Sequence, residues 1–320
     1  MLRWHRPLLL CSGLLAVLAL ACLGGLLLDD RTLDGVPVWA KPLKFAVSFA
    51  VYTLTWAWLL SLLRRTPRGG RRLGTVLAAA SAFETALITF QAARGTRSHF
   101  NVATEADTAI YTLMGATATV LMAANMFAAL LVLRERRADP VATRALRWGL
   151  ALSAAGIALG YLMVLPTPQQ LADPAAVIGA HGVGVPDGGP GLPLLGWSTT
   201  GGDLRVPHFV GMHAVQVLPL LALALSPLRD RGAALRLVTA AGAGYAGLLA
   251  LVTWQALRGQ PLLRPDGATL TAAALLLVAV TAGALSARRS PHHPTPEHPA
   301  PDRPGPARPG PAVPAETEAR

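Results

Sequence analysis

Long apolar stretches alternate with short polar connections along the chain as far as about residue 286. Eight of these stretches are long enough, or nearly so, to cross a lipid bilayer, which takes about 20 residues. We expect each to form a transmembrane helix, the fifth being the shortest. The predicted spans cover residues 7–28, 43–63, 74–93, 108–133, 148–164, 207–226, 235–257 and 267–286. The pattern predicts an all-α fold, a polytopic transmembrane bundle of about eight helices within one domain, residues 1–286.

The first span begins close to the N-terminus and follows Arg3 and Arg6, as the apolar part of a signal peptide does. Its apolar run of 22 residues is longer than the roughly 7–15 residues of a usual signal. The residues before Cys22 match a lipoprotein cleavage site poorly. We therefore interpret this span as a retained helix.

The composition excludes an ordinary water-soluble domain, because 52% of the residues are hydrophobic and only 14% are charged, against about 25% charged in a typical globular protein. The formal net charge of +11 does not indicate nucleic-acid binding, since the arginines lie in short clusters between apolar runs. With the N-terminus inside, 20 of the 28 basic residues fall on the inner side. By the positive-inside rule we expect a multi-pass protein of the cell inner (plasma) membrane, with both termini cytoplasmic, the lipid bilayer around it and no nucleic acid as a partner.

The C-terminal segment, residues 287–320, differs from the rest of the chain. It contains five consecutive Pro-x-x-Pro-x units, and proline at this density disfavours helices and strands. We expect a disordered, proline-rich cytoplasmic tail with polyproline II character. One interpretation is protein docking to an SH3-like partner, or weak metal binding by His292, His293 and His298; the other is a solvated low-complexity extension.

The longest connection between spans, residues 165–206, is rich in glycine and proline. Loops of this length without evident secondary structure usually carry function or are disordered. Its last residues include Asp203 and Arg205, directly before the sixth span. The chain carries no signature of a phosphate-binding loop, a serine hydrolase or a zinc protease.

Polar residues inside the predicted spans are candidates for function, because an ionisable group in lipid is expensive. Glu84 lies near the middle of the third span, and Gln91 lies two turns further along the same face. The functional hypothesis is a carboxylate that handles a proton or a cation. The structural hypothesis is a buried carboxyl group that joins neighbouring helices.

The second span carries a continuous polar stripe formed by Lys44, Ser48, Tyr52 and Thr55 at steps of four, four and three residues. We expect this face to point into the bundle or into a wet cavity. The chain has only two lysines, and both flank Pro42. Because a buried ammonium group can lose its proton whereas a guanidinium group effectively cannot, Lys44 is a candidate for chemistry or for pairing with a carboxylate. The alternative is that its charge extends to the outer membrane surface.

Four histidines fall on the outer side or in the outer halves of the spans: His99, His181, His208 and His213, the last followed three residues later by Gln216. His208 and His213 are five residues apart, about 140° around a helix, so they do not share a face. A metal or haem site would therefore need a ligand from another helix. The candidate ligands for haem or a divalent metal, the cofactors that histidines suit, are His99, His208 and His213.

Three stretches, residues 41–50 (KPLKFAVSFA), 83–101 (from FETA to SHFN) and 196–213 (GWSTTGGDLRVPHFVGMH), together resemble an uncharacterised family of bacterial (actinobacterial-type) multi-pass integral membrane proteins. The resemblance covers most of the membrane portion and excludes the proline-rich tail. It implies a bacterial inner-membrane protein and no known activity. Membrane hydrolases with a Ser-x-x-x-His and His-x-x-x-His zinc set are a poor match, because His208 and His213 have the wrong spacing.

The polar residues assigned to the outer half of the bundle form the candidate site. They are Lys44, Ser48, Glu84, Gln91, His99, Asp203, Arg205, His208, His213 and Gln216. The leading hypothesis is a membrane protein with an outward-opening polar cavity that binds or passes a small solute or ion, with Glu84 handling the charge. One alternative is a haem- or metal-binding membrane redox protein or hydrolase. The other is a non-catalytic assembly or signalling subunit that docks through its tail.

Overall fold

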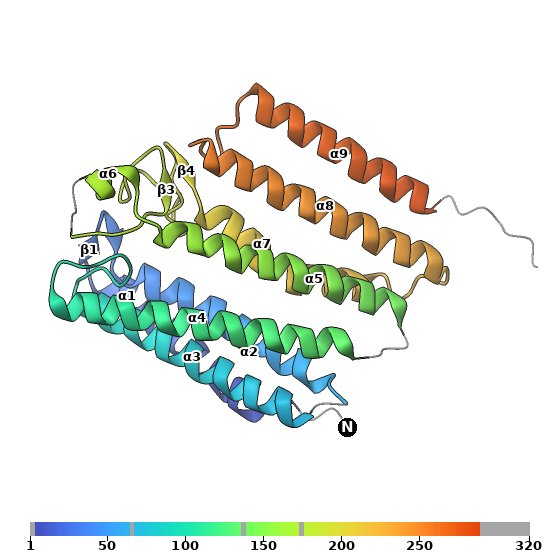
Figure 1. Ribbon diagram of the computed structural model, residues 1–320, viewed down its shortest axis with the longest axis horizontal. Helices are drawn as coiled ribbons and strands as arrows, with labels where there is room; N and C mark the ends of the chain where they lie inside the picture. The colour runs from blue at the N-terminus through green and yellow to red at the C-terminus, as the bar shows by residue number, and fades with distance from the viewer. Residues whose placement is uncertain (1–3, 65–66, 136–138, 173–175, 289–320) are drawn as a thin grey trace, which may run out of the picture.

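The computed structural model describes residues 4–64, 67–135, 139–172 and 176–288. Eight of the helices in these segments are long and apolar enough to cross a membrane, and they lie side by side in one bundle (Figure 1). They are α1 (Arg6–Leu28), α2 (Ala40–Ser61), α3 (Pro67–Ala93), α4 (Glu105–Arg134), α5 (Pro140–Leu159), α7 (Arg205–Ala224), α8 (Arg231–Leu257) and α9 (Gly267–Arg288). The predicted all-α polytopic bundle is confirmed. The expected proline-rich tail lies outside the described residues, apart from its first two.

Most of the helices begin earlier than the apolar pattern predicts, and the difference is largest for α3, by seven residues, and α5, by eight. Both open with a proline, which suits the first turn of a helix because its missing N–H would be unpaired there anyway. Asp139 caps α5 by accepting hydrogen bonds from the backbone N–H groups of Val141 and Ala142, at 2.8 and 3.4 Å. Hydropathy marks the lipid-facing part of a helix, whereas capping decides where the helix begins, so the prediction placed these two starts too late.

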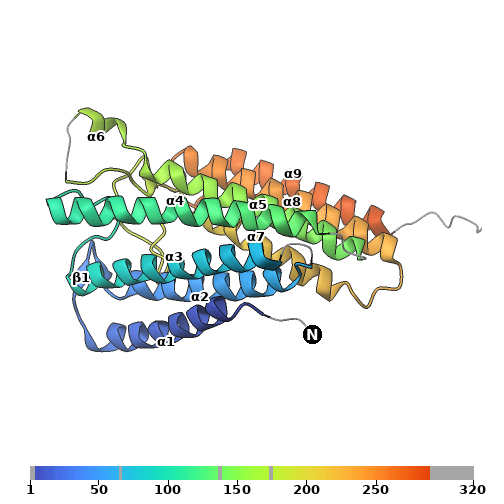
Figure 2. The same cartoon turned by 60° about the horizontal axis from the view of Figure 1, so that its bottom comes forward.

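The bundle has two packed groups of helices, which Figure 2 shows from a second direction. One apolar core joins α1, α2, α3 and α4, with Leu146, Leu150 and Val215 added from α5 and α7; a second joins α5, α7 and α8. α5 and α7 approach closely at Gly156, where a Cβ atom would lie 2.5 Å from the carbonyl carbon of Gly211. Small residues allow such close approaches between transmembrane helices.

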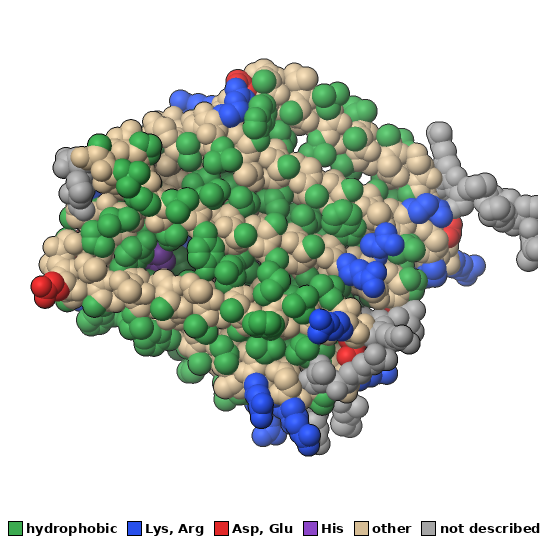
Figure 3. Space-filling model, in the orientation of Figure 1, with side chains coloured by type: hydrophobic (Ala, Val, Ile, Leu, Met, Phe, Trp, Pro, Cys, Tyr) green, Lys and Arg blue, Asp and Glu red, His purple; other side chains and the backbone are tan. Residues whose placement is uncertain are grey.

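The two ends of the bundle differ in character. Lys and Arg side chains gather at the end where α4 finishes and α5 begins (Figure 3); we call this the basic end. α1 starts and α9 finishes at this same end (Figure 1). The other end carries the connections 29–39, 94–104, 160–204 and 258–266, and we call it the loop end.

The loop end contains more regular structure than the sequence indicates. β1 (Thr32–Leu33) and β2 (Val36–Pro37) form a small antiparallel pair between α1 and α2. The long connection after α5 contains a 3-10 turn (Gly160–Val164), the short helix α6 (Pro168–Ala172), and β3 (Gly182–Val183), which pairs antiparallel with β4 (Gly202–Asp203). This pairing folds the connection back over the start of α7, and it thereby brings polar residues from distant parts of the chain together.

Candidate functional site at the loop end

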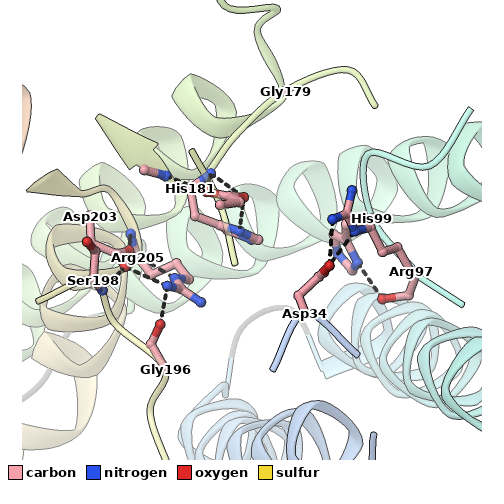
Figure 4. A network of polar contacts seen from close by, with 12 residues as sticks. Asp34, Arg97, His99, Gly179, His181, Gly196, Ser198, Asp203 and Arg205 are labelled. Atoms are coloured by element: carbon pink, nitrogen blue, oxygen red, sulfur yellow. Dashed lines mark hydrogen bonds and ion pairs between the residues drawn. The ribbon is translucent and has the colours of Figure 1, made fainter. Parts of the chain in front are cut away.

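Two cationic side chains, one from α2 and one from α7, hold the same turn of the long connection. The Lys44 ammonium donates a hydrogen bond to the carbonyl oxygen of Leu195 at 2.9 Å. The Arg205 guanidinium donates to the next carbonyl, that of Gly196, at 2.5 Å (Figure 4). A Cβ atom at Gly196 would lie 3.8 Å from Lys44 Nζ and 3.9 Å from Arg205 Nη1. The two charges therefore converge on one point of the loop.

Asp203 fixes the guanidinium of Arg205 in this position. Arg205 donates to both carboxylate oxygens of Asp203, from Nε at 2.9 Å and from Nη2 at 2.5 Å. The backbone N–H of Ser198 also donates to Asp203, at 2.8 Å. The Asp203 side chain is only 2% exposed, and a two-pronged pair of this kind defines the orientation of both groups. Sequence reasoning assigned both residues to the site, and the structure brings them together with Lys44.

Glu84 and His99 face one another beneath this loop. Glu84 comes from α3, and His99 comes from the connection 94–104, which folds into the bundle and buries Ser98 and Phe100. His99 Nε2 and Glu84 Oε1 are 3.9 Å apart, too far for a direct hydrogen bond. The Glu84 side chain is 8% exposed, and its other oxygen, Oε2, has no hydrogen-bond partner among the described residues.

His99 gives Glu84 no positive charge in direct contact. Burial, together with the nearby Lys41 and His181, lowers the pKa of His99 well below its ordinary value. A neutral imidazole supplies no positive charge to an ionised carboxylate. Glu84 is therefore a buried acid without a charged partner in direct contact.

His181 and Asp187 form a second acid–imidazole pair at the loop end (Figure 4 labels His181). His181 Nδ1 lies 2.7 Å from Asp187 Oδ2, and the backbone N–H groups of His181 and Gly182 donate to the same carboxylate. Burial lowers the pKa of His181 despite this bond. Burial alone would raise the pKa of Asp187, but the hydrogen bonds from His181 and Gly182 outweigh it and hold that pKa below its ordinary value. The Phe100 ring lies 4.8 Å from that of His181.

Gln91 belongs to a separate polar cluster at the junction of α3 and α4. Its side-chain amide donates to Asp107 at 3.0 Å, and Arg94 donates to the same carboxylate oxygen at 2.9 Å. Thr104 caps α4 and also donates to Asp107, at 2.8 Å. Every polar atom of this cluster that is buried has a partner, so Gln91 stabilises the helix junction and does not join Glu84.

The predicted residues deeper in the bundle are distributed over several contacts. His208 lies 2.7 Å, through Nδ1, from the carbonyl oxygen of Gly156, which links α7 to α5. Gln216 donates to Thr55 at 3.2 Å and so links α7 to α2. His213 packs on Phe209, with ring centroids 4.3 Å apart. Two buried atoms here, His213 Nε2 and Gln216 Oε1, have no partner in the described chain.

The rest of the polar stripe of α2 faces into the bundle, as predicted. Tyr52 donates to Asn125 of α4 at 3.1 Å, and Thr55 accepts the bond from Gln216. Ser48, half-buried, lies on the same face between Lys44 and Tyr52. The stripe thus connects the loop-end site with the middle of the bundle.

The candidate metal ligands His99, His208 and His213 do not share one centre. His208 bonds to the backbone of α5 and His99 lies against Ser98 and Glu84. Within residues 4–64, 67–135, 139–172 and 176–288, no group of three or more His, Cys, Asp or Glu side chains is placed to hold a metal ion.

Three residues that sequence reasoning left out of the site lie within it: Lys41, His181 and Asp187. Lys41 is affected electrostatically by Lys44, Arg205, Asp187 and Glu84. Its proximity to Lys44 in the first turn of one helix was a usable signal. The place of His181 and Asp187 depends on the fold of the long connection, for which the sequence carries no comparable signal.

The fold and this site define a class: a multi-pass helical membrane protein with a charged polar site at one end of its bundle. Comparisons of the chain with protein-family models, with curated proteins and with solved structures find no match.

Proposed function

We propose that this chain is a bacterial inner-membrane protein that binds or passes a small solute or ion at its loop end, with Glu84 as the group that takes up and releases charge. One observation carries the proposal. Glu84 lies within an apolar span and is almost fully buried, yet one carboxylate oxygen has no partner among the described residues. Buried polar atoms are almost always hydrogen-bonded, so an exception requires an explanation.

A transient partner explains this exception better than a structural role does. A carboxyl group that only joined helices would be bonded to a neighbouring helix, as Gln91 and Asp107 are to each other. Glu84 instead faces a neutral imidazole across 3.9 Å. A water molecule, a proton carrier or a bound solute at Oε2 would supply the missing hydrogen bond.

The distribution of charge supports an outward-facing loop end. The basic end carries arginines at the starts of α1, α3, α5 and α8 and at the end of α4: Arg6, Arg68, Arg144, Arg231 and Arg134. Cytoplasmic ends of membrane proteins are enriched in such residues. We therefore assign the basic end to the cytoplasm and the loop end to the outside.

The test is proton movement in reconstituted liposomes. Purified protein is placed in liposomes that contain the pH indicator pyranine, a potassium diffusion potential is imposed with valinomycin, and the internal pH is followed. We expect the wild type to acidify the liposomes, Glu84→Gln to reduce the rate to that of empty liposomes, and the control Glu105→Gln to leave it unchanged. Glu105 is an exposed acid at the start of α4, at the same end of the bundle.

The folding of each variant is checked by circular dichroism and gel filtration, because loss of flux in an unfolded variant carries no information. A correctly folded Glu84→Gln protein with wild-type proton movement contradicts the proposal. So does a wild-type protein that moves protons no faster than empty liposomes.

A further inference from the structure

Both lysines of the chain lie in the first turn and a half of α2, where positive charge is unfavourable for two reasons. Lys41 and Lys44 are three residues apart, so they are neighbours on the helix surface and repel one another. The N-terminus of a helix carries the positive end of its dipole, which favours anions. α2 has no acidic residue in its first turn and no side-chain cap.

The carboxylates at the loop end attract these lysines only from a distance: Asp187 and Glu84 attract Lys41, and Asp203 attracts Lys44. Asp203 is bonded by Arg205 and the backbone N–H of Ser198. Asp187 is bonded by His181 and the backbone N–H of Gly182. Neither carboxylate forms an ion pair with a lysine among the described residues.

The N–H donors of this site that have no acceptor in the described part of the chain belong to positively charged side chains. Lys44 donates only to Leu195, so two of its three N–H groups have no protein partner in the described part of the chain. Lys41 is half-buried and has neither a hydrogen bond nor an ion pair there. Lys44 and Arg205 repel it, and the weaker attraction of Asp187 and Glu84 offsets this repulsion only in part. Arg205 Nη1 likewise makes no hydrogen bond to a described residue, although the same guanidinium is held rigidly by Asp203.

We propose that the ligand of the loop-end site is a small oxyanion, a phosphate, sulfate or carboxylate group bound by Lys41, Lys44 and Arg205 Nη1. This inference rests on the proposed function and names the class of solute that its site takes. An anion at this place would pair both lysines, would lie at the favourable end of α2, and would meet a guanidinium already fixed in position. Such a group comes either from a free solute or from the headgroup of an anionic lipid in the outer leaflet.

The first arm of the test measures binding of radiolabelled inorganic phosphate to the protein in dodecyl maltoside micelles, which carry no phosphate, at constant ionic strength. We expect saturable binding that sulfate displaces. Lys41→Gln should weaken it at least about tenfold, because a charged hydrogen bond is lost, and Lys41→Arg should retain most of it. The matched control is Arg264→Gln, which removes an exposed cation from the same end of the bundle and should change nothing.

The second arm compares melting temperatures in nanodiscs of phosphatidylcholine with and without phosphatidylglycerol. One outcome identifies a lipid headgroup as the source of the anion. In this outcome free phosphate does not bind, and phosphatidylglycerol raises the melting temperature of the wild type and of Arg264→Gln but not that of Lys41→Gln. Equal effects of the two substitutions, or no anion effect in either arm, overturn the inference. If Lys41→Gln does not fold, failure of sulfate to displace phosphate from the wild type overturns it instead.

The two proposals fail separately. Proton movement that depends on Glu84 without any anion binding refutes the oxyanion site alone. Anion binding that depends on Lys41, together with a Glu84→Gln variant of normal proton movement, refutes the role of Glu84 alone.

Discussion

Replacing Asp203 by asparagine tests how strongly the long connection is held against the bundle. The substitution keeps the size of the side chain but removes its charge, and it turns one acceptor into a donor that faces Ser198 N–H and Arg205. Asp203 is 2% exposed and Arg205 30%. Breaking a fully buried pair costs about 3–5 kcal/mol, and solvent screening of the guanidinium reduces this. We therefore expect the segment 192–204 to lose about 2–3 kcal/mol of local stability.

Hydrogen–deuterium exchange measures this local stability directly, because the exchange rate rises about tenfold for each 1.4 kcal/mol by which the opening free energy falls. A loss of about 2–3 kcal/mol corresponds to exchange that is roughly 30- to 150-fold faster. The matched control is Asp34→Asn, which removes the carboxylate from a second aspartate–arginine pair at the loop end (Figure 4), one in which Arg97 donates to both oxygens at 2.6 and 2.8 Å. Those two side chains are 38% and 34% exposed, so we expect at most about 1 kcal/mol.

The comparison has a clear contrary result. If Asp34→Asn accelerates exchange around its own loop as much as Asp203→Asn accelerates exchange in residues 192–204, burial does not control the strength of these pairs and the reasoning is wrong. The same conclusion follows if Asp203→Asn leaves exchange in residues 192–204 unchanged.

Three further predictions concern packing, pH and cofactors. In denaturant titration, Gly156→Val should lower the free energy of unfolding by about 1–3 kcal/mol or more, because the valine side chain would overlap α7. The control Gly13→Val should not lower it in this way, because the space around Gly13 is open. Because the pKa of His99 is lowered in the folded protein, the free energy of unfolding should fall as the pH drops below about 6.5. His99→Asn should reduce this pH dependence, and equal pH profiles of the free energy of unfolding for the two proteins refute the prediction. The purified protein should show no Soret band before or after dithionite reduction, and a band would favour the alternative of a haem protein over the proposed function.

The eight spans could be predicted because lipid imposes one simple requirement, about 20 apolar residues, on each of them. The starts of α3 and α5 could not, because Pro67, Asp139 and Pro140 act through local capping, which hydropathy does not measure. Glu84 and Lys44 were identified for a similar physical reason. A charge within an apolar stretch is costly wherever the helices pack, so it stands out before the fold is known.

At the loop end, the hydrogen-bond partners of a polar residue distinguish a structural role from a functional one. These partners depend on contacts between distant parts of the chain. Gln91 and Glu84 lie on the same face of α3 and look alike in the sequence, yet Gln91 is fully bonded and Glu84 is not. Lys41 and Lys44 likewise differ only once residues 192–204 have folded over α2 and supplied a carbonyl to one of them. A polar residue whose hydrogen-bonding groups all have protein partners has a structural role. The hydrogen-bonding groups of Glu84 and Lys41 gain a full set of partners only when a proton, water molecule or ligand is bound.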